Sequence, residues 1–209
     1  FERQAIYVAG GAAGAVEGLQ DLLKRAPYHA SYRMTVNCRN AERIAQTLTV
    51  ASGLVPGYTR VLQDFEGADV DPLFYTRSDG QPAILRQAVG KLLSTFRPQD
   101  IVVLSMRADV DSCAKATSGD QEWNLVPIKK AKNAHDIPFC SIHAFKGLEA
   151  PAVIITDIEN LDDKNSRALL YIGMSRPKIR LFMLMHEKCR ASYSRILDSG
   201  LKAISRRQG

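Results

Sequence analysis

Short runs of apolar, mostly β-branched residues alternate along the chain with longer amphipathic stretches. This pattern predicts strands at 32–36, 73–76, 101–106, 124–129, 138–142, 152–156 and 180–185, and helices at 14–25, 41–51, 81–96, 108–117, 165–174 and 188–204. The run Ala152–Thr156 is typical of a strand buried on both faces of a parallel sheet. The alternation of strands and helices therefore predicts an α/β fold with an open, mostly parallel sheet flanked by helices.

The segments between these elements predict connections and no further domain. Residues 53–72 are rich in Gly, Pro and Asp and are expected to form one long connection, and residues 117–122 and 133–137 are interpreted as shorter loops. The 209 residues are therefore expected to form a single domain, 1–209. Because the chain begins with Phe1, close to a motif, we expect it to be a fragment of a longer protein.

Composition narrows the class of protein. Hydrophobic residues make up 45% and charged residues 24%, which are ordinary globular values and exclude disordered, collagen-like and coiled-coil chains. The sequence has no apolar run long enough for a membrane span and no signal peptide pattern, so we expect no membrane partner. Cys38, Cys113, Cys140 and Cys189 lie far apart, without metal-ligand spacing. We therefore expect buried or semi-buried thiols, no metal and a cytoplasmic location.

The net charge of +6 is concentrated near the C-terminus. Residues 1–169 carry 19 basic and 20 acidic side chains, whereas residues 170–209 carry 9 basic and 2 acidic ones. A basic stretch of this kind suits nucleic acid or another polyanion. A solvated helix face followed by a frayed tail explains the charge equally well, and the sequence leaves both interpretations open.

The motifs that would let the chain perform chemistry by itself are missing from the sequence. It lacks the phosphate-binding pattern GxxxxGK[ST], and the Gly-rich segment Gly10–Gly14 is not followed by Lys and Ser or Thr. The sequence also has no nucleophile elbow, no paired-carboxylate motif and no His-Glu-x-x-His. We therefore expect the chain alone to be unable to perform its own chemistry.

Polar clusters do follow the predicted elements. Asn37-Cys-Arg-Asn40 comes after the strand that ends at residue 36, His143–Glu149 comes after the strand that ends at residue 142, and Gly173-Met-Ser-Arg176 ends a helix. Each cluster places a cation at a junction between elements: Arg39, Lys146 and Arg176. Cations held in this way can neutralise the oxygens of a phosphoryl group during its transfer.

In this order, the clusters resemble the second RecA-like motor domain (domain 2A, the UvrD-like helicase C-terminal domain) of superfamily 1 helicases of the UvrD/Rep/PcrA kind. Residues 1–7 resemble the end of motif III and residues 32–40 resemble motif IV. Residues 141–149 are similar to motif V and residues 170–176 to motif VI, a specific combination. The resemblance spans essentially the whole chain and implies a RecA-like fold without its own Walker A motif.

The resemblance implies an ATP-facing group of residues. Gln4, Arg39 and Arg176 would meet the γ-phosphate of ATP, and Arg176 would be the arginine finger. Glu149, with Gly147 nearby, would contact the nucleotide sugar or the phosphate end of the cleft. ATP and Mg²⁺ would be held mainly by an N-terminal ATP-binding domain that is not in this sequence, so the isolated fragment is expected to be inactive.

The resemblance also implies a second group that faces nucleic acid. His143 would contact single-stranded DNA, Tyr7 would lie near the path of the strand, and Lys146 is either a further contact or the partner of a carboxylate. The predicted function is thus the C-terminal motor of an ATP-dependent DNA helicase or translocase.

Three departures from the family pattern keep other functions open. Ala9 stands where the family commonly has an aromatic residue, and Pro177 stands where it usually has Ala. Only about a hundred residues separate Arg39 from His143, so the accessory 2B domain of larger relatives is expected to be absent or vestigial. The alternative is a non-catalytic nucleic-acid-binding or regulatory module with a degenerate helicase fold. A third hypothesis is a motor that serves a nuclease fusion or a defence protein.

Overall fold

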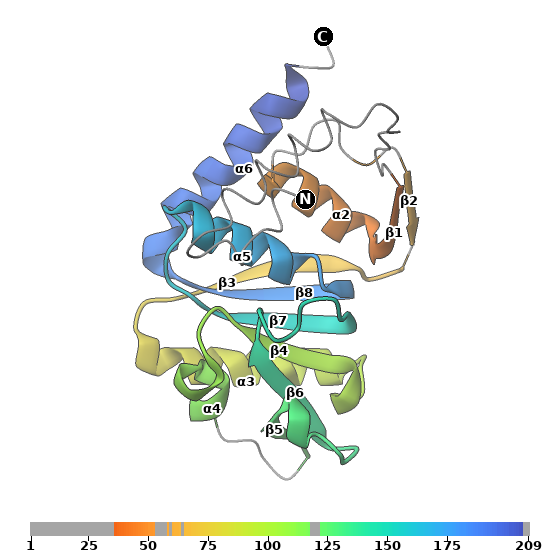
Figure 1. Ribbon diagram of the computed structural model, residues 1–209, viewed down its shortest axis with the longest axis vertical. Coiled ribbons are helices and arrows are strands. Elements are labelled where there is room, and N and C mark those ends of the chain that lie inside the picture. Colours follow the sequence, from red (N-terminus) through yellow and green to blue (C-terminus); the bar gives the residue numbers. More distant parts are fainter. Residues whose placement is uncertain (1–35, 53–57, 59, 64, 118–121, 207–209) are drawn as a thin grey trace, which may run out of the picture.

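A six-stranded sheet lies at the centre of the computed structural model, which describes residues 36–52, 58, 60–63, 65–117 and 122–206 (Figure 1). Its order is β3-β8-β7-β4-β6-β5, and every neighbouring pair is parallel. The strands are β3 (Asp69–Tyr75), β4 (Ile101–Ser105), β5 (Asn124–Pro127), β6 (Asp136–Ser141), β7 (Ala150–Ile158) and β8 (Pro177–His186). The predicted α/β class, with a mostly parallel sheet flanked by helices, is confirmed.

Helices cover both faces of this sheet (Figure 1). They are α2 (Glu42–Ser52), α3 (Gln81–Leu93), α4 (Cys113–Ala116), α5 (Lys164–Met174) and α6 (Arg190–Ser205), with short 3-10 turns at Ser78–Gly80, Pro98–Asp100, Asp109–Asp111, Ile128–Lys130 and Glu187–Cys189. Helices α2, α5 and α6 share one apolar core with the sheet, and α3 and α4 share the other. Strands β4 and β7 supply both cores, which explains their continuous apolar sequences.

A second, two-stranded parallel sheet corrects the interpretation of two segments. Strand β1 (Val36–Ala41) pairs with β2 (Arg60–Gln63), so Asn37–Asn40 lie within a strand and do not follow one. The supposed connection 53–72 contains β2 and the first residues of β3. Strand β2 has only two apolar residues, Val61 and Leu62, and is too short to stand out among Gly, Pro and Asp. The expected strand residues 32–35 and the expected helix 14–25 lie outside the described part of the chain.

Strand β3 begins earlier than expected, and a proline lies inside it. Pro72 lies in its middle, paired in register with Met183 of β8. Proline has no N–H to donate, so it is confined to strands with a free side. Strand β3 is the first of the six in the sheet order, and its other side has no strand among the described residues.

Helix α4 is much shorter than the expected 108–117. Ser112 caps its start, since its hydroxyl accepts a hydrogen bond from the N–H of Lys115. Residues Asp109–Asp111 form a separate 3-10 turn instead. A serine cap three residues before a backbone donor marks a helix start that apolar periodicity alone does not reveal.

The prediction of buried or semi-buried thiols is confirmed for three of the four cysteines. Cys113, Cys140 and Cys189 are buried free thiols, whereas Cys38 is exposed in β1. Burial raises the pKa of Cys113 and Cys140 to about 12, which leaves both thiols protonated at neutral pH. Among the described residues, no helix is both long enough and apolar enough to cross a membrane.

Candidate nucleotide-binding site

Arg39 meets two distant segments of the chain at the amino ends of β7 and β8. Its Nε lies 3.0 Å from Oε2 of Glu149, and its Nη1 lies 3.5 Å from the carbonyl oxygen of Ser175. The backbone beside it is fixed locally, because the side-chain oxygen of Asn37 accepts from the N–H groups of Arg39 and Asn40, both at 3.0 Å. Strand β1 thus directs Arg39 toward the residues that the motifs placed with it.

Asn40 attaches β1 to the beginning of β8. It is buried, and its Nδ2 donates to the carbonyl oxygens of Ser175 at 3.4 Å and of Pro177 at 2.5 Å. Asn37 is also buried, and its Nδ2 donates to Oδ1 of Asn40 at 3.1 Å. Asn40 thus links the small sheet to the start of β8, while Asn37 orients Asn40 within β1, and the side chains of both asparagines have hydrogen-bond partners.

Arg176 lies directly after α5, in a position fixed by close packing. A Cβ at Gly173 would lie 2.9 Å from side-chain atoms of Ile142 and Ile155, so glycine lets the last turn of α5 approach the sheet. The backbone N–H of Arg176 then donates to the carbonyl of Gly173 at 3.0 Å, and its carbonyl accepts from Ala150 at 3.2 Å. The end of α5 and the amino edge of the sheet are therefore held together at this residue.

The guanidinium of Arg176 is bound within its own domain. Its residue exposure is 5%, and it donates to the carbonyls of Ile172 at 3.0 Å and Leu148 at 3.3 Å and to the hydroxyl of Ser175 at 2.8 Å. Burial, followed by the nearby charge of Arg39, lowers the pKa of Arg176 from its usual value. A nearby anion would stabilise the charged form of a guanidinium in this environment.

Glu149 is the carboxylate at the centre of the group. Its Oε1 lies 2.6 Å from Nζ of Lys178, and its Oε2 pairs with Arg39. The hydrogen bond from Lys178, followed by that from Arg39, lowers the pKa of Glu149 below its usual value. We call Arg39, Arg176 and Lys178 around Glu149 the basic cluster.

The segment between β6 and β7 carries the predicted nucleic-acid contacts. His143, Lys146 and Gly147 are exposed, while Ile142 and Phe145 are buried beneath them. The segment turns back on itself through backbone hydrogen bonds such as that from Lys146 to the carbonyl of His143 at 3.3 Å. Gly147 has a φ of +90°, a left-handed conformation that favours glycine and turns the chain toward Glu149.

The predicted site residues are thus only partly brought together. Arg39, Glu149 and Arg176 converge, and His143 and Lys146 share the exposed surface of the segment that leads to Glu149. Gln4 and Tyr7 lie outside the described residues. The described residues contain no group of three His, Cys, Asp or Glu side chains that could hold a metal ion.

Comparison with known proteins supports a helicase-type C-terminal domain. The family model described as the UvrD-like helicase C-terminal domain matches residues 137–184. The resemblance to this family is confirmed. Among solved structures, the C-terminal domain of a possible DNA helicase from Lactobacillus plantarum WCFS1 is similar, with a TM-score of 0.51 and 16% identity over 71% of this chain and 87% of that chain. At this identity the likeness shows the fold alone. Among curated proteins, no sequence matches the chain.

The residues that match the UvrD-like helicase C-terminal domain include most of the basic cluster. The matched segment runs from β6 into β8 and contains Glu149, Arg176 and Lys178. Arg39 lies outside the matched residues, so its place beside Glu149 comes from the structure. The match supports a helicase motor domain for this part of the chain.

Several residues in or beside the basic cluster were not among the predicted site residues. Lys178 belongs to the cluster through its pair with Glu149, and Asn40 binds the backbone carbonyl of Ser175 beside it. Tyr58 lies next to it: burial and the neighbouring Tyr171 raise its pKa to about 12, while the charge of Arg39 acts in the opposite direction. Lys178 has a sequence signal, because it stands two residues after Arg176. Tyr58 has none, since it lies in the supposed connection.

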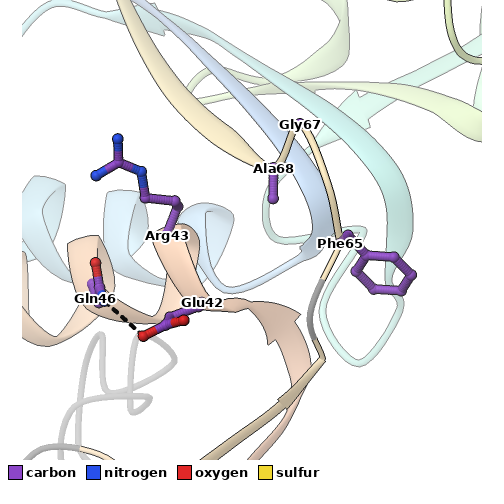
Figure 2. A pocket seen from close by; sticks show the side chains of 6 residues that line it. All are labelled: Glu42, Arg43, Gln46, Phe65, Gly67 and Ala68. Atoms are coloured by element: carbon purple, nitrogen blue, oxygen red, sulfur yellow. Dashed lines mark hydrogen bonds between the residues drawn. The ribbon is translucent and has the colours of Figure 1, made fainter.

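A cavity lies beside the small sheet, separate from the basic cluster. Its volume is about 270 Å³, and Figure 2 shows α2 on one side of it and the turn between β2 and β3 on the other. Glu42, Arg43, Gln46, Phe65, Gly67 and Ala68 line it. Gln46 donates to Glu42 at 3.0 Å. None of the predicted site residues within the described ranges lines this cavity.

Proposed function

We propose that this chain is the second motor domain of an ATP-dependent DNA helicase or translocase. One observation carries the proposal: Arg39 from the small sheet approaches within 3.5 Å of the carbonyl of Ser175, 136 residues later in the chain, directly beside Arg176. Motif-bearing segments that are far apart in sequence thus gather cations at one edge of the sheet. That arrangement is suited to binding the phosphate end of a nucleotide.

In this proposal the basic cluster completes a site on a partner domain. An N-terminal domain holds most of ATP and its Mg²⁺, and this chain supplies positive charge to the γ-phosphate when the two domains close. Arg39 then exchanges Glu149 for a phosphate oxygen, and the guanidinium of Arg176 exchanges its carbonyl partners for another. Because these cations arrive only on closure, hydrolysis is coupled to domain movement.

The nucleic-acid contact is assigned to the segment between β6 and β7. His143 and Lys146 are exposed there, and the buried Phe145 anchors the backbone between them. The same segment continues into Glu149. A strand bound at His143 is therefore connected to the nucleotide site through a few residues of backbone, which suits a motor that links ATP turnover to strand movement.

The test is ATP hydrolysis by the full-length protein, measured with and without single-stranded DNA. We expect hydrolysis that the strand stimulates strongly, and strand binding whose log affinity falls linearly with log salt concentration. A folded full-length protein that hydrolyses no ATP under either condition contradicts the motor assignment.

The alternative, a non-catalytic nucleic-acid-binding or regulatory module, is favoured by the state of Arg176. Its guanidinium is almost fully buried and bonded to three oxygens of its own domain, and Pro177 follows it. Salt-sensitive strand binding without any ATP turnover supports this second function. Strand-stimulated turnover excludes it.

A further inference from the structure

Lys178 is the third cation of the basic cluster, and no role has yet been assigned to it. Its Nζ lies 2.6 Å from Oε1 of Glu149, while Nε of Arg39 lies 3.0 Å from Oε2 of the same carboxylate. Each carboxylate oxygen therefore has its own cation. The three side chains are similarly exposed, at 40% for Lys178, 40% for Glu149 and 42% for Arg39, so an incoming ligand can reach all of them.

The backbone holds Lys178 next to Glu149. Ala150 and Pro177, the first residues of β7 and β8, pair in register; Glu149 directly precedes this pair and Lys178 directly follows it. Pro177 is buried, and its carbonyl accepts from Nδ2 of Asn40 at 2.5 Å. Two strands and a buried side-chain hydrogen bond thus fix the start of β8. Lys178 therefore lies on a fixed strand, and Glu149 is the last residue of the segment that leads into β7.

The two cations contribute unequally to Glu149. The hydrogen bond from Lys178 is the largest cause of the lowered pKa of the carboxyl group, ahead of the contribution from Arg39. Arg39 also has a second, longer contact, to the carbonyl of Ser175. In the proposed function, Arg39 is the cation that leaves Glu149 and binds a phosphate oxygen. Without Lys178, its departure would leave an unpaired carboxylate beside an arriving triphosphate, and like charges repel.

We propose that Lys178 is a positioning residue, which retains the Glu149 carboxylate when the Arg39 guanidinium leaves it for a phosphate oxygen. This inference rests on the proposed function, because it assumes that a nucleotide phosphate meets Arg39. Lys178 acts through Glu149 and makes no contact with the reacting atoms. Its effect is on nucleotide binding, since it reduces the repulsion that the bound phosphates would otherwise meet.

The test is steady-state ATP hydrolysis by the full-length protein with single-stranded DNA present. We expect Lys178→Met to raise the KM for ATP about fivefold, the upper range for a partly exposed charge pair, with kcat nearly unchanged. Lys178→Arg keeps a cation within reach of Glu149 and is expected to retain most of the affinity. In the double variant with Glu149→Gln, the Lys178→Met change is expected to have no further effect, because no carboxylate remains to be held.

Lys188→Met is the matched control. Lys188 approaches Glu159 to 4.0 Å at the opposite edge of the sheet, and its loss is expected to leave KM unchanged. Thermal unfolding of each variant establishes that it is folded. An unchanged KM in Lys178→Met, or effects of Lys178→Met and Glu149→Gln that multiply in the double variant, overturns the assignment of Lys178 alone. A folded wild type without ATP turnover overturns the proposed function, and this inference with it.

Discussion

Asp157 lies near the end of β7, and its carboxylate is almost completely enclosed. It is 4% exposed and adopts a φ of +62°, a left-handed conformation that Asp tolerates better than most residues. Its Oδ2 accepts from the hydroxyls of Ser105 at 2.7 Å and Thr156 at 2.8 Å, and both oxygens lie 3.2 Å from the N–H of Cys113 at the start of α4. Ligands of open α/β sheets commonly bind at this edge. Here the carboxylate of the protein itself occupies the position, while the basic cluster lies at the opposite edge.

Replacing Asp157 with Ala is expected to lower the free energy of unfolding by about 2–4 kcal/mol, because it leaves buried donors unsatisfied and places Ala in a left-handed conformation. Chemical denaturation monitored by circular dichroism measures the change. Asp111→Ala, at an exposed position of the neighbouring 3-10 turn, is the control and is expected to change stability by less than about 0.5 kcal/mol. Equal stability of both variants would contradict this account of the carboxylate.

Glu149 gives the basic cluster a pH dependence. Its pKa is lowered in the folded state, first by Lys178 and then by Arg39, so its pairing stabilises the fold above the pKa of the unfolded state. This stabilisation is lost as the pH falls below the ordinary glutamate pKa of about 4.3 and through the lowered folded pKa. Because the carboxylate is 40% exposed, solvent screens the pairs and the effect is small.

The measurement is the free energy of unfolding of wild type and Glu149→Gln between pH 7 and pH 3. We expect a small advantage of the wild type at pH 7 that shrinks on acidification. An advantage that grows toward low pH would mean that the carboxylate is not held by cations.

At the scale of elements, the crossing of α2 and α6 is set by one glycine. A Cβ at Gly200 would lie 1.8 Å from the carbonyl oxygen of Val50, a distance at which the backbones must move apart. Helix α2 follows directly after β1, the strand that carries Arg39. The packing of two helices on one face of the sheet is thereby linked to the basic cluster.

Gly200→Ala is expected to destabilise the protein by about 1–3 kcal/mol, the usual range for overpacking. Gly90→Ala in α3 is the matched control, since its Cβ would meet nothing within 4 Å. There, alanine removes the conformational entropy of an exposed helix glycine and is expected to stabilise by about 0.5–1 kcal/mol. Thermal or urea unfolding compares the two variants. Changes of the same sign would show that the contact with Val50 does not control the crossing.

Sequence patterns predicted the six strands of the central sheet well, because each strand contains a short apolar run. They missed β2, whose four residues gain their structure only by pairing with β1. They also placed Arg39 in a loop, although the neighbouring Asn37 and Asn40 hold it in a strand. The convergence of Arg39 with Glu149 depends on contacts between residues more than a hundred positions apart. No local pattern contains that information, whereas the motifs indicated which residues to examine.

At the scale of the whole molecule, the basic excess of residues 170–209 divides into two parts. Arg176 and Lys178 belong to the basic cluster at the start of β8. Farther along, Arg190 pairs with Glu187 and lies over the ring of Phe74 at 3.7 Å, and other cations extend along α6. The first part serves the proposed nucleotide site. The second is in part compensated by local carboxylates, as in a solvated helix face.

In the proposed function, this domain supplies an arginine to ATP bound by a partner domain. The most direct measurement is the ATP turnover of full-length Arg176→Ala in the presence of single-stranded DNA. We expect a loss of about 10³–10⁵-fold, the range of arginine-finger contributions. Arg176→Lys is expected to be strongly impaired as well, because an ammonium group cannot reproduce the planar fork.

Arg167→Ala serves as the control, since Arg167 is exposed on α5, the helix that precedes Arg176, and contacts only backbone carbonyls in the described structure. Its turnover is expected to match that of the wild type, and thermal unfolding shows whether the Arg176 variants are folded. A folded Arg176→Ala protein that loses its strand-stimulated turnover supports the account. A folded Arg176→Ala protein that hydrolyses ATP at the wild-type rate contradicts it.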